Sequence, residues 1–124
     1  MKLKQYKLTR AYQSIMMNLA SAQLPMQNAY DVYLLCKAIE PFYTFEINQR
    51  KALIERYNGE IDDGMNPRFK SELDAISFRD AITELANCEV DLDVKKIEIP
   101  VLSLGDARIS PVDIASMEDF VSFI

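Results

Sequence analysis

Residues 26–57, MQNAYDVYLLCKAIEPFYTFEINQRKALIERY, are the stretch that decides the fold, because apolar residues recur at helical spacing along most of it. In its first half the apolar residues cover most of the helical wheel, which is typical of a helix that is central in its domain or covered by another chain. Pro41 lacks an amide donor and disfavours helical geometry at Glu40. The stretch therefore predicts a long bent helix, or two nearly collinear ones, which ends at Asn58-Gly59 with Gly59 in the left-handed conformation.

The two ends of the chain carry further helix signals. The opening KLKQYKL at residues 2–8 mixes lysines with apolar residues and predicts a short edge strand or an extended arm. Thr9 is a suitable N-cap, and the spacing after it predicts a first helix from residue 10 to about residue 21. Near the other end, Ser110 as N-cap and Pro111 at the first helical position predict a short closing helix that docks on the body of the domain.

Residues 57–69, YNGEIDDGMNPRF, follow the long helix and hold two of the three glycines of the chain. We interpret the acidic middle of this segment as a turn that stays in water. Asn66 followed by Pro67 is a strong helix start, so we expect a helix from residue 67 to about residue 87. Joined to the long helix by a short loop, it should pack antiparallel to that helix.

The apolar period changes in EVDLDVKKIEIPVLSL, residues 89–104. Apolar residues alternate with acids, the pair Lys95-Lys96 interrupts the alternation, and it then resumes. This pattern predicts a hairpin or a bent strand that ends near Pro100. Gly105 marks the turn that follows.

Length and composition indicate the number of domains, and the positions of the charged residues give the charge of each half. A chain of 124 residues with 49% hydrophobic residues can bury a core as a single domain over residues 1–124. Residues 1–58 carry eight Lys/Arg and four Asp/Glu, a net charge of +4, whereas residues 59–124 carry six and fifteen, a net charge of −9. We favour attraction within the fold, or a role in solubility, over two faces of opposite charge that are presented to a partner. The fold class that we expect is α+β and mostly helical, with an antiparallel helix pair or bundle and a small C-terminal strand region, which the N-terminal arm could join to form a small sheet.

Several chemistries are excluded or disfavoured by residue types. The chain has no histidine, which excludes imidazole-based triads and most zinc sites, and it has no phosphate-cradling glycine motif. We therefore expect no enzyme, no catalytic residues, no metal ligands and no cofactor. Cys36 and Cys88 lie in apolar helical patterns and are expected to be buried, reduced thiols. With neither a signal peptide nor a membrane span indicated, we expect a cytoplasmic protein.

Two acidic sets leave an alternative open. Neither glycine register of the first set fits an EF-hand, yet each set could hold a divalent ion or a small molecule through its carboxylates. The simpler interpretation is a solvated turn for the first set and the polar face of a half-buried strand for the second. The sets are Glu60, Asp62 and Asp63, and Glu89, Asp91 and Asp93.

Candidate partner surfaces come from aromatic and charged side chains. Five aromatic residues between residues 30 and 45 are more than one small helix easily buries, so Tyr43 and Phe45 could form part of an interface. The acids at residues 60–63 could contact a basic partner. Lys2, Lys4 and Lys7 with Arg10, Tyr6 and Tyr12 form a small basic and aromatic patch, but a pI of about 4.7 disfavours a nucleic-acid partner.

Four segments together resemble a known group of proteins. They are the KLKQYKL start, the helix ending RKALIERYNGE, the EVDLDVKKIEIPVLSL region and the closing ISPVDIASMEDFVSFI. Over nearly the whole chain this order is similar to small proteins of tailed phages and prophages of Gram-positive bacteria, of the DUF1617 type. The resemblance transfers no catalytic residue. It implies a non-catalytic phage or prophage accessory protein, located in the bacterial host cell, that binds another protein, phage or host, or itself, in virion assembly or in control of a host factor. Divalent-metal or small-molecule binding and weak nucleic-acid binding are the alternatives.

Overall fold

The computed structural model describes residues 1–124 and confirms a mostly helical α+β fold. The helices are α1 (Gln5–Asn18), α2 (Met26–Arg56), α3 (Glu72–Ala86) and α4 (Pro111–Met117), with a 3-10 turn at Val101–Leu104. The strands form three pairs: β1 (Lys2–Lys4) antiparallel with β4 (Glu89–Asp91), β2 (Glu60–Ile61) antiparallel with β3 (Pro67–Arg68), and β5 (Ile97–Ile99) parallel with β6 (Val121–Phe123).

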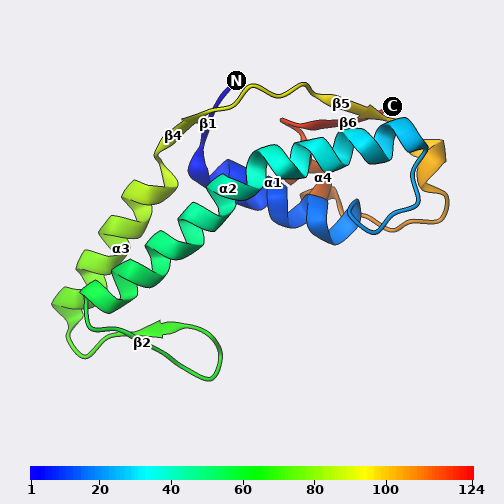
Figure 1. Cartoon of the computed structure of the whole chain (residues 1–124). Helices are drawn as coiled ribbons and strands as arrows, with labels where there is room; N and C mark the ends of the chain where they lie inside the picture. Colours follow the sequence, from blue (N-terminus) through cyan, green and yellow to red (C-terminus); the bar gives the residue numbers. More distant parts are fainter.

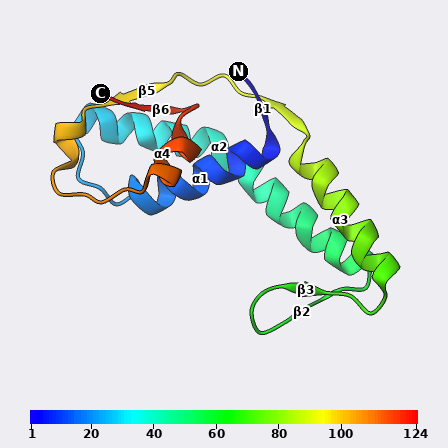
Figure 2. The same cartoon turned by 180° about the vertical axis from the view of Figure 1, so that it is seen from behind.

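The main hydrophobic core lies between α1, the N-terminal half of α2, α4 and the strands at the two chain ends. The C-terminal half of α2, the β2–β3 hairpin and α3 extend away from this core (Figures 1 and 2). We call this projecting part the arm. Only Ile54 and Phe78 are buried in the arm, and neither belongs to the main cluster. The largest fully buried apolar side chains are all in the main core: Leu8, Ile15, Leu19, Ile39, Ile99, Met117 and Phe120.

Helix α1 begins at Gln5, so the predicted start at residue 10 was wrong. The side chains of Gln5, Leu8, Ala11 and Ile15 recur at three- and four-residue steps and are all buried. Burial of this face extends the helix into the basic segment, and Thr9 lies inside the helix instead of capping it. The Gln5 Nε2 group donates a hydrogen bond to the Phe42 carbonyl at 3.0 Å. Only Lys2–Lys4 form the expected edge strand.

Helix α2 is continuous through Pro41, so the structure shows one long helix. It ends at Arg56, and just beyond its C-cap Asn58 has a φ of 58° and donates its N–H to the Glu55 carbonyl at 3.1 Å. The N–H of Gly59 donates to the Ile54 carbonyl at 2.7 Å, which completes a Schellman ending. The residue in the left-handed conformation is therefore Asn58, not the predicted Gly59.

Helix α3 begins at Glu72, so the predicted start at Asn66-Pro67 was also wrong. The Ser71 side chain accepts the N–H of Asp74 at 3.0 Å and caps the helix. Pro67 instead belongs to β3. As predicted, α3 runs antiparallel beside α2 (Figure 1).

The strand region confirms the N-terminal arm as a partner, because β1 pairs with β4, but it departs from the predicted hairpin. β4 and β5 do not form a hairpin with each other, because each pairs with one end of the chain. β5 does end just before Pro100, and the turn at Gly105 is present. Ser110 caps α4 as predicted by accepting the N–H of Asp113 at 3.1 Å.

The cysteines are more accessible than predicted. Cys36 is half-buried, and burial followed by the nearby Glu40 carboxylate raises the pKa of its thiol. Cys88 is exposed, because it lies in the connection between α3 and β4 and not on a core-facing helical turn. No helix combines the length and apolar content needed to cross a bilayer.

Candidate functional site

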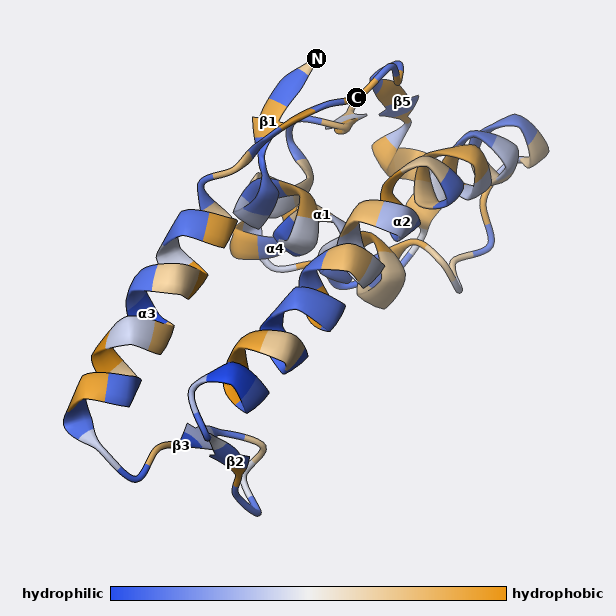
Figure 3. Cartoon of the chain, turned by 60° about the vertical axis from the view of Figure 1, so that its left-hand side comes forward, coloured by the Kyte–Doolittle hydropathy of each residue, from blue (hydrophilic) through white to orange (hydrophobic).

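One side of α2 is apolar although it faces away from the main core. The core side of the same helix carries Val32, Leu35 and Ile39. Tyr30, Leu34 and Phe45 are 52%, 47% and 52% exposed, respectively. Figure 3 shows hydrophobic residues spread along α2 between hydrophilic ones. Helical spacing places five residues on this side, which we call the outer face: Tyr30, Leu34, Ala38, Pro41 and Phe45.

Some aromatic side chains of α2 pack against the protein, and others are exposed to solvent. The rings of Tyr43 and Tyr12 lie 4.5 Å apart between centroids, so the predicted partner residue Tyr43 is half-buried against α1. Burial, followed by the Glu40 carboxylate, raises the pKa of Tyr12. Tyr30 and Tyr33 instead stack in solvent at 6.4 Å between centroids. Phe45 stays exposed, which leaves it available for the contact that its pattern predicted.

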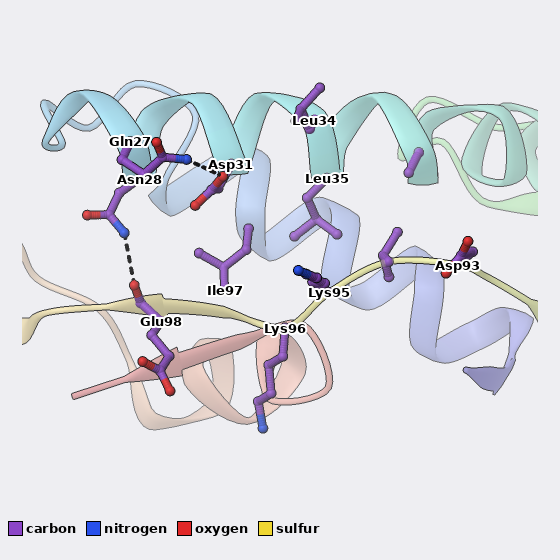
Figure 4. A pocket seen from close by; sticks show the side chains of 12 residues that line it. Gln27, Asn28, Asp31, Leu34, Leu35, Asp93, Lys95, Lys96, Ile97 and Glu98 are labelled. Carbon is purple, nitrogen blue, oxygen red and sulfur yellow. Dashed lines mark hydrogen bonds between the residues drawn. The ribbon is translucent and has the colours of Figure 1, made fainter.

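A groove of about 640 Å³ runs beside the outer face, between the N-terminal half of α2 and residues 93–98. Figure 4 shows Leu35 of the helix and Ile97 of β5 directed toward each other across its floor. Leu34 and Ala38 line it from the outer face. The groove and the outer face are therefore continuous.

Polar groups fix the two walls of the groove. Asn28 Nδ2 donates to the Glu98 carbonyl at 2.9 Å, which ties α2 to β5 (Figure 4). Gln27 Nε2 donates to Asp31 Oδ1 at 2.9 Å. Neither Asp31 nor Asp93 takes part in a salt bridge. The groove thus offers an apolar floor with carboxylates that have no cationic partner.

The sequence predicted none of this groove, although one signal was present. Leu92 is buried and Val94 half-buried, but the next buried residues are Ile97 and Ile99. The step of three between Val94 and Ile97 breaks the two-residue period of a strand. It separates β4 from β5 and leaves the intervening backbone beside α2.

The acidic hairpin is held by its own hydrogen bonds. Asp62 Oδ1 accepts the N–H groups of Gly64 at 3.0 Å and Asn66 at 2.9 Å, and Oδ2 accepts from Arg68 Nε at 2.7 Å. The Arg68 hydrogen bond, followed by the Asn66 N–H, lowers the pKa of Asp62. Asp62 is thus a structural part of the turn, whereas Glu60 and Asp63 are exposed.

The second acidic set lies opposite the basic N-terminus. In the β1–β4 register Lys2 faces Asp91 and Lys4 faces Glu89, and the N-terminal amine contacts Asp91 at 3.4 Å. Asp93 lies apart from these pairs, in the wall of the groove. No group of three or more acidic or cysteine side chains in the chain is arranged to hold a metal ion.

The basic patch is likewise close to acids. Lys7 and Arg10 line a hollow of about 330 Å³ between α1 and α4, together with Glu118 and Asp119. The Arg10 guanidinium also lies 5.2 Å from the Tyr6 ring centroid. The predicted partner residues are therefore spread over three places: the basic end, the middle of α2 and the tip of the arm.

Comparison with known proteins finds no match to a protein-family model, a curated protein or a solved structure.

Proposed function

We propose that the protein acts by binding another protein through the outer face of α2, as a non-catalytic accessory protein of a phage or prophage in the bacterial cytoplasm. The observation that carries the binding role is the exposure of Tyr30, Leu34 and Phe45 along one side of a core helix. The phage context rests on the sequence resemblance.

Covering the apolar surface of this face would supply free energy for binding a partner. Aromatic side chains present about 150–250 Å² each, so covering the exposed half of Tyr30 or Phe45 would contribute about 2 kcal/mol apiece. Exposed apolar side chains that lie contiguously on one face are typical of interaction sites, whereas scattered ones are ordinary. Self-association through the same face is the variant of this proposal in which the partner is a second copy.

A capture experiment with matched variants tests the proposal. Tagged wild-type protein, Leu34→Glu and Leu73→Glu are used to capture proteins from lysate of infected or induced host cells, and the mass of each purified variant is measured by light scattering. Leu73 is an exposed leucine at the start of α3, far from the outer face. We expect Leu34→Glu alone to lose the captured partner or the dimer.

Two results would overturn the proposal. One is a strict monomer that captures no protein. The other is an identical set of captured proteins for both glutamate variants, which would place the binding surface elsewhere.

A further inference from the structure

The β5 wall of the groove presents a strand edge to α2. Ile97 donates its N–H to the Phe120 carbonyl at 2.8 Å, and the Ile99 carbonyl accepts from Ile124 at 3.0 Å. Since alternate residues of a parallel strand bond to the same neighbour, the peptide groups of Glu98 face the opposite edge. There the Glu98 carbonyl meets Asn28 of α2 at 2.9 Å. The edge of β5 that lacks a neighbouring strand is therefore the one in the groove.

The unpaired edge continues into the residues before β5. No backbone amide or carbonyl of residues 93–96 makes a hydrogen bond within the chain. Four residues of a strand at about 3.3 Å per residue span roughly 13 Å. An edge of this kind is a template for another extended chain.

We propose that this groove takes an extended peptide segment of the partner, which adds as a strand along residues 93–96 and packs against α2. The inference rests on the proposed function and specifies how the partner is bound. Main-chain groups of the peptide pair with the free edge, while its apolar side chains lie on Leu35 and Ile97 or against Leu34. A helical segment cannot use the edge, because its own backbone groups are bonded internally.

The charged side chains of the groove determine which peptide sequences it should bind. Asp31 on the helix wall and Asp93 on the strand wall are carboxylates without salt-bridge partners, placed toward opposite ends of the groove (Figure 4). Lys95 lies between them, whereas Lys96 points away from α2. The groove is thus complementary to a peptide with apolar residues in its middle and basic residues toward its ends.

Selection from a displayed library of random heptapeptides tests the proposal. The library is selected on the wild-type protein and counter-selected on Ala38→Arg, whose side chain would fill the groove from the α2 wall. Melting and circular dichroism of Ala38→Arg establish that it folds. We expect enriched peptides with alternating apolar residues and basic ends, which bind Ala38→Arg at least ~10-fold more weakly than wild type and bind Leu73→Glu unchanged.

Backbone methylation of the best synthetic peptide separates strand addition from other modes. Methylating the N–H of every second residue, those facing the edge, should weaken binding by about 10-fold or more per site, whereas methylating the others should not. Failure to enrich any peptide over the counter-selection overturns the proposal, and so does indifference to methylation at every position.

The two proposals fail in different ways. If partner capture is lost in Leu34→Glu but no methylation-sensitive peptide is found, strand addition is wrong and binding through the outer face stands. If groove peptides bind but partner capture is the same in Leu34→Glu and Leu73→Glu, the proposed function is wrong.

Discussion

Two adjacent residues stop helix α2 by different means. Asn58 supplies the left-handed turn at a φ of 58°. Gly59 is required by space instead, because a Cβ there would lie 2.5 Å from Cε1 of Phe69. The sequence pair Asn-Gly predicts the stop but does not assign these roles, since either residue can adopt a positive φ.

Opposite outcomes are therefore expected for substitutions at these two positions. Asn58→Gly should leave the free energy of unfolding unchanged or raise it by up to about 1 kcal/mol, because glycine adopts this conformation without strain. Gly59→Ala should lower it by about 1–3 kcal/mol through the clash with Phe69. Urea unfolding of both variants checks this, and a more stable Gly59→Ala would contradict the assignment.

Asp62 makes the stability of the β2–β3 hairpin depend on pH. Its pKa is lower in the folded chain than in the unfolded chain, so its carboxylate stabilises the turn above the unfolded pKa of about 3.9, and this contribution is lost as the pH falls through the folded pKa. At neutral pH, Asp62→Asn should speed amide exchange at Gly64 and Asn66, measured by NMR. Asp63→Asn is the matched control and should not. Equal effects of both variants would argue against this role of Asp62.

At the scale of elements, the sequence predicted the number and type of helices better than their ends. The 3.6-residue period fixed α2, and Ser110 with Pro111 fixed the start of α4. The start of α3 was missed because Asp62 binds the amide of Asn66, which holds the strong cap signal in the hairpin. The pairing of the N-terminal arm with the C-terminal strand region was predicted, but its register was not, because local sequence does not determine a pairing of residues as far apart as Lys2 and Asp91. The parallel pairing of β5 with β6 was not predicted. The groove depends on these pairings.

Pro41 is the expected weak point of α2. It lies inside a continuous helix of 31 residues, where it removes one hydrogen bond. Pro41→Ala should raise the free energy of unfolding by up to about 3 kcal/mol in urea titration. Pro111→Ala at the first turn of α4 should leave the free energy of unfolding nearly unchanged or lower it. The first helical residues have no helical acceptor for their N–H groups, so proline removes no hydrogen bond there. A destabilised Pro41→Ala would mean that the core requires the proline.

At the scale of the molecule, packing is divided between the main core and the arm. The arm buries only Ile54 and Phe78, with Phe69 and Phe78 in contact at 4.8 Å between centroids. The main core instead joins both chain ends to α1 and α2. Opposite charges of the two halves meet here, where β1 pairs with β4 and α1 packs on α4, which supports an internal role for the charge asymmetry.

The two regions should respond differently to loss of an aromatic ring. Phe120→Ala in the main core should lower the free energy of global unfolding by about 3–5 kcal/mol. Phe78→Ala should open the arm first, so that amides of residues 72–86 exchange faster while those of residues 8–15 stay protected. Native-state hydrogen exchange checks both, and simultaneous loss of protection in both regions would show that they unfold as one unit.

The central claim is that a partner binds beside α2 along residues 93–96, and amide exchange at these residues tests it most directly. These amides have no hydrogen bond in the chain, so they should exchange at rates close to those of an unstructured peptide. With a selected peptide bound, exchange at alternate residues should slow by at least ~10-fold, while the intervening ones change little. Unchanged exchange along residues 93–96 in the saturated complex would contradict the account.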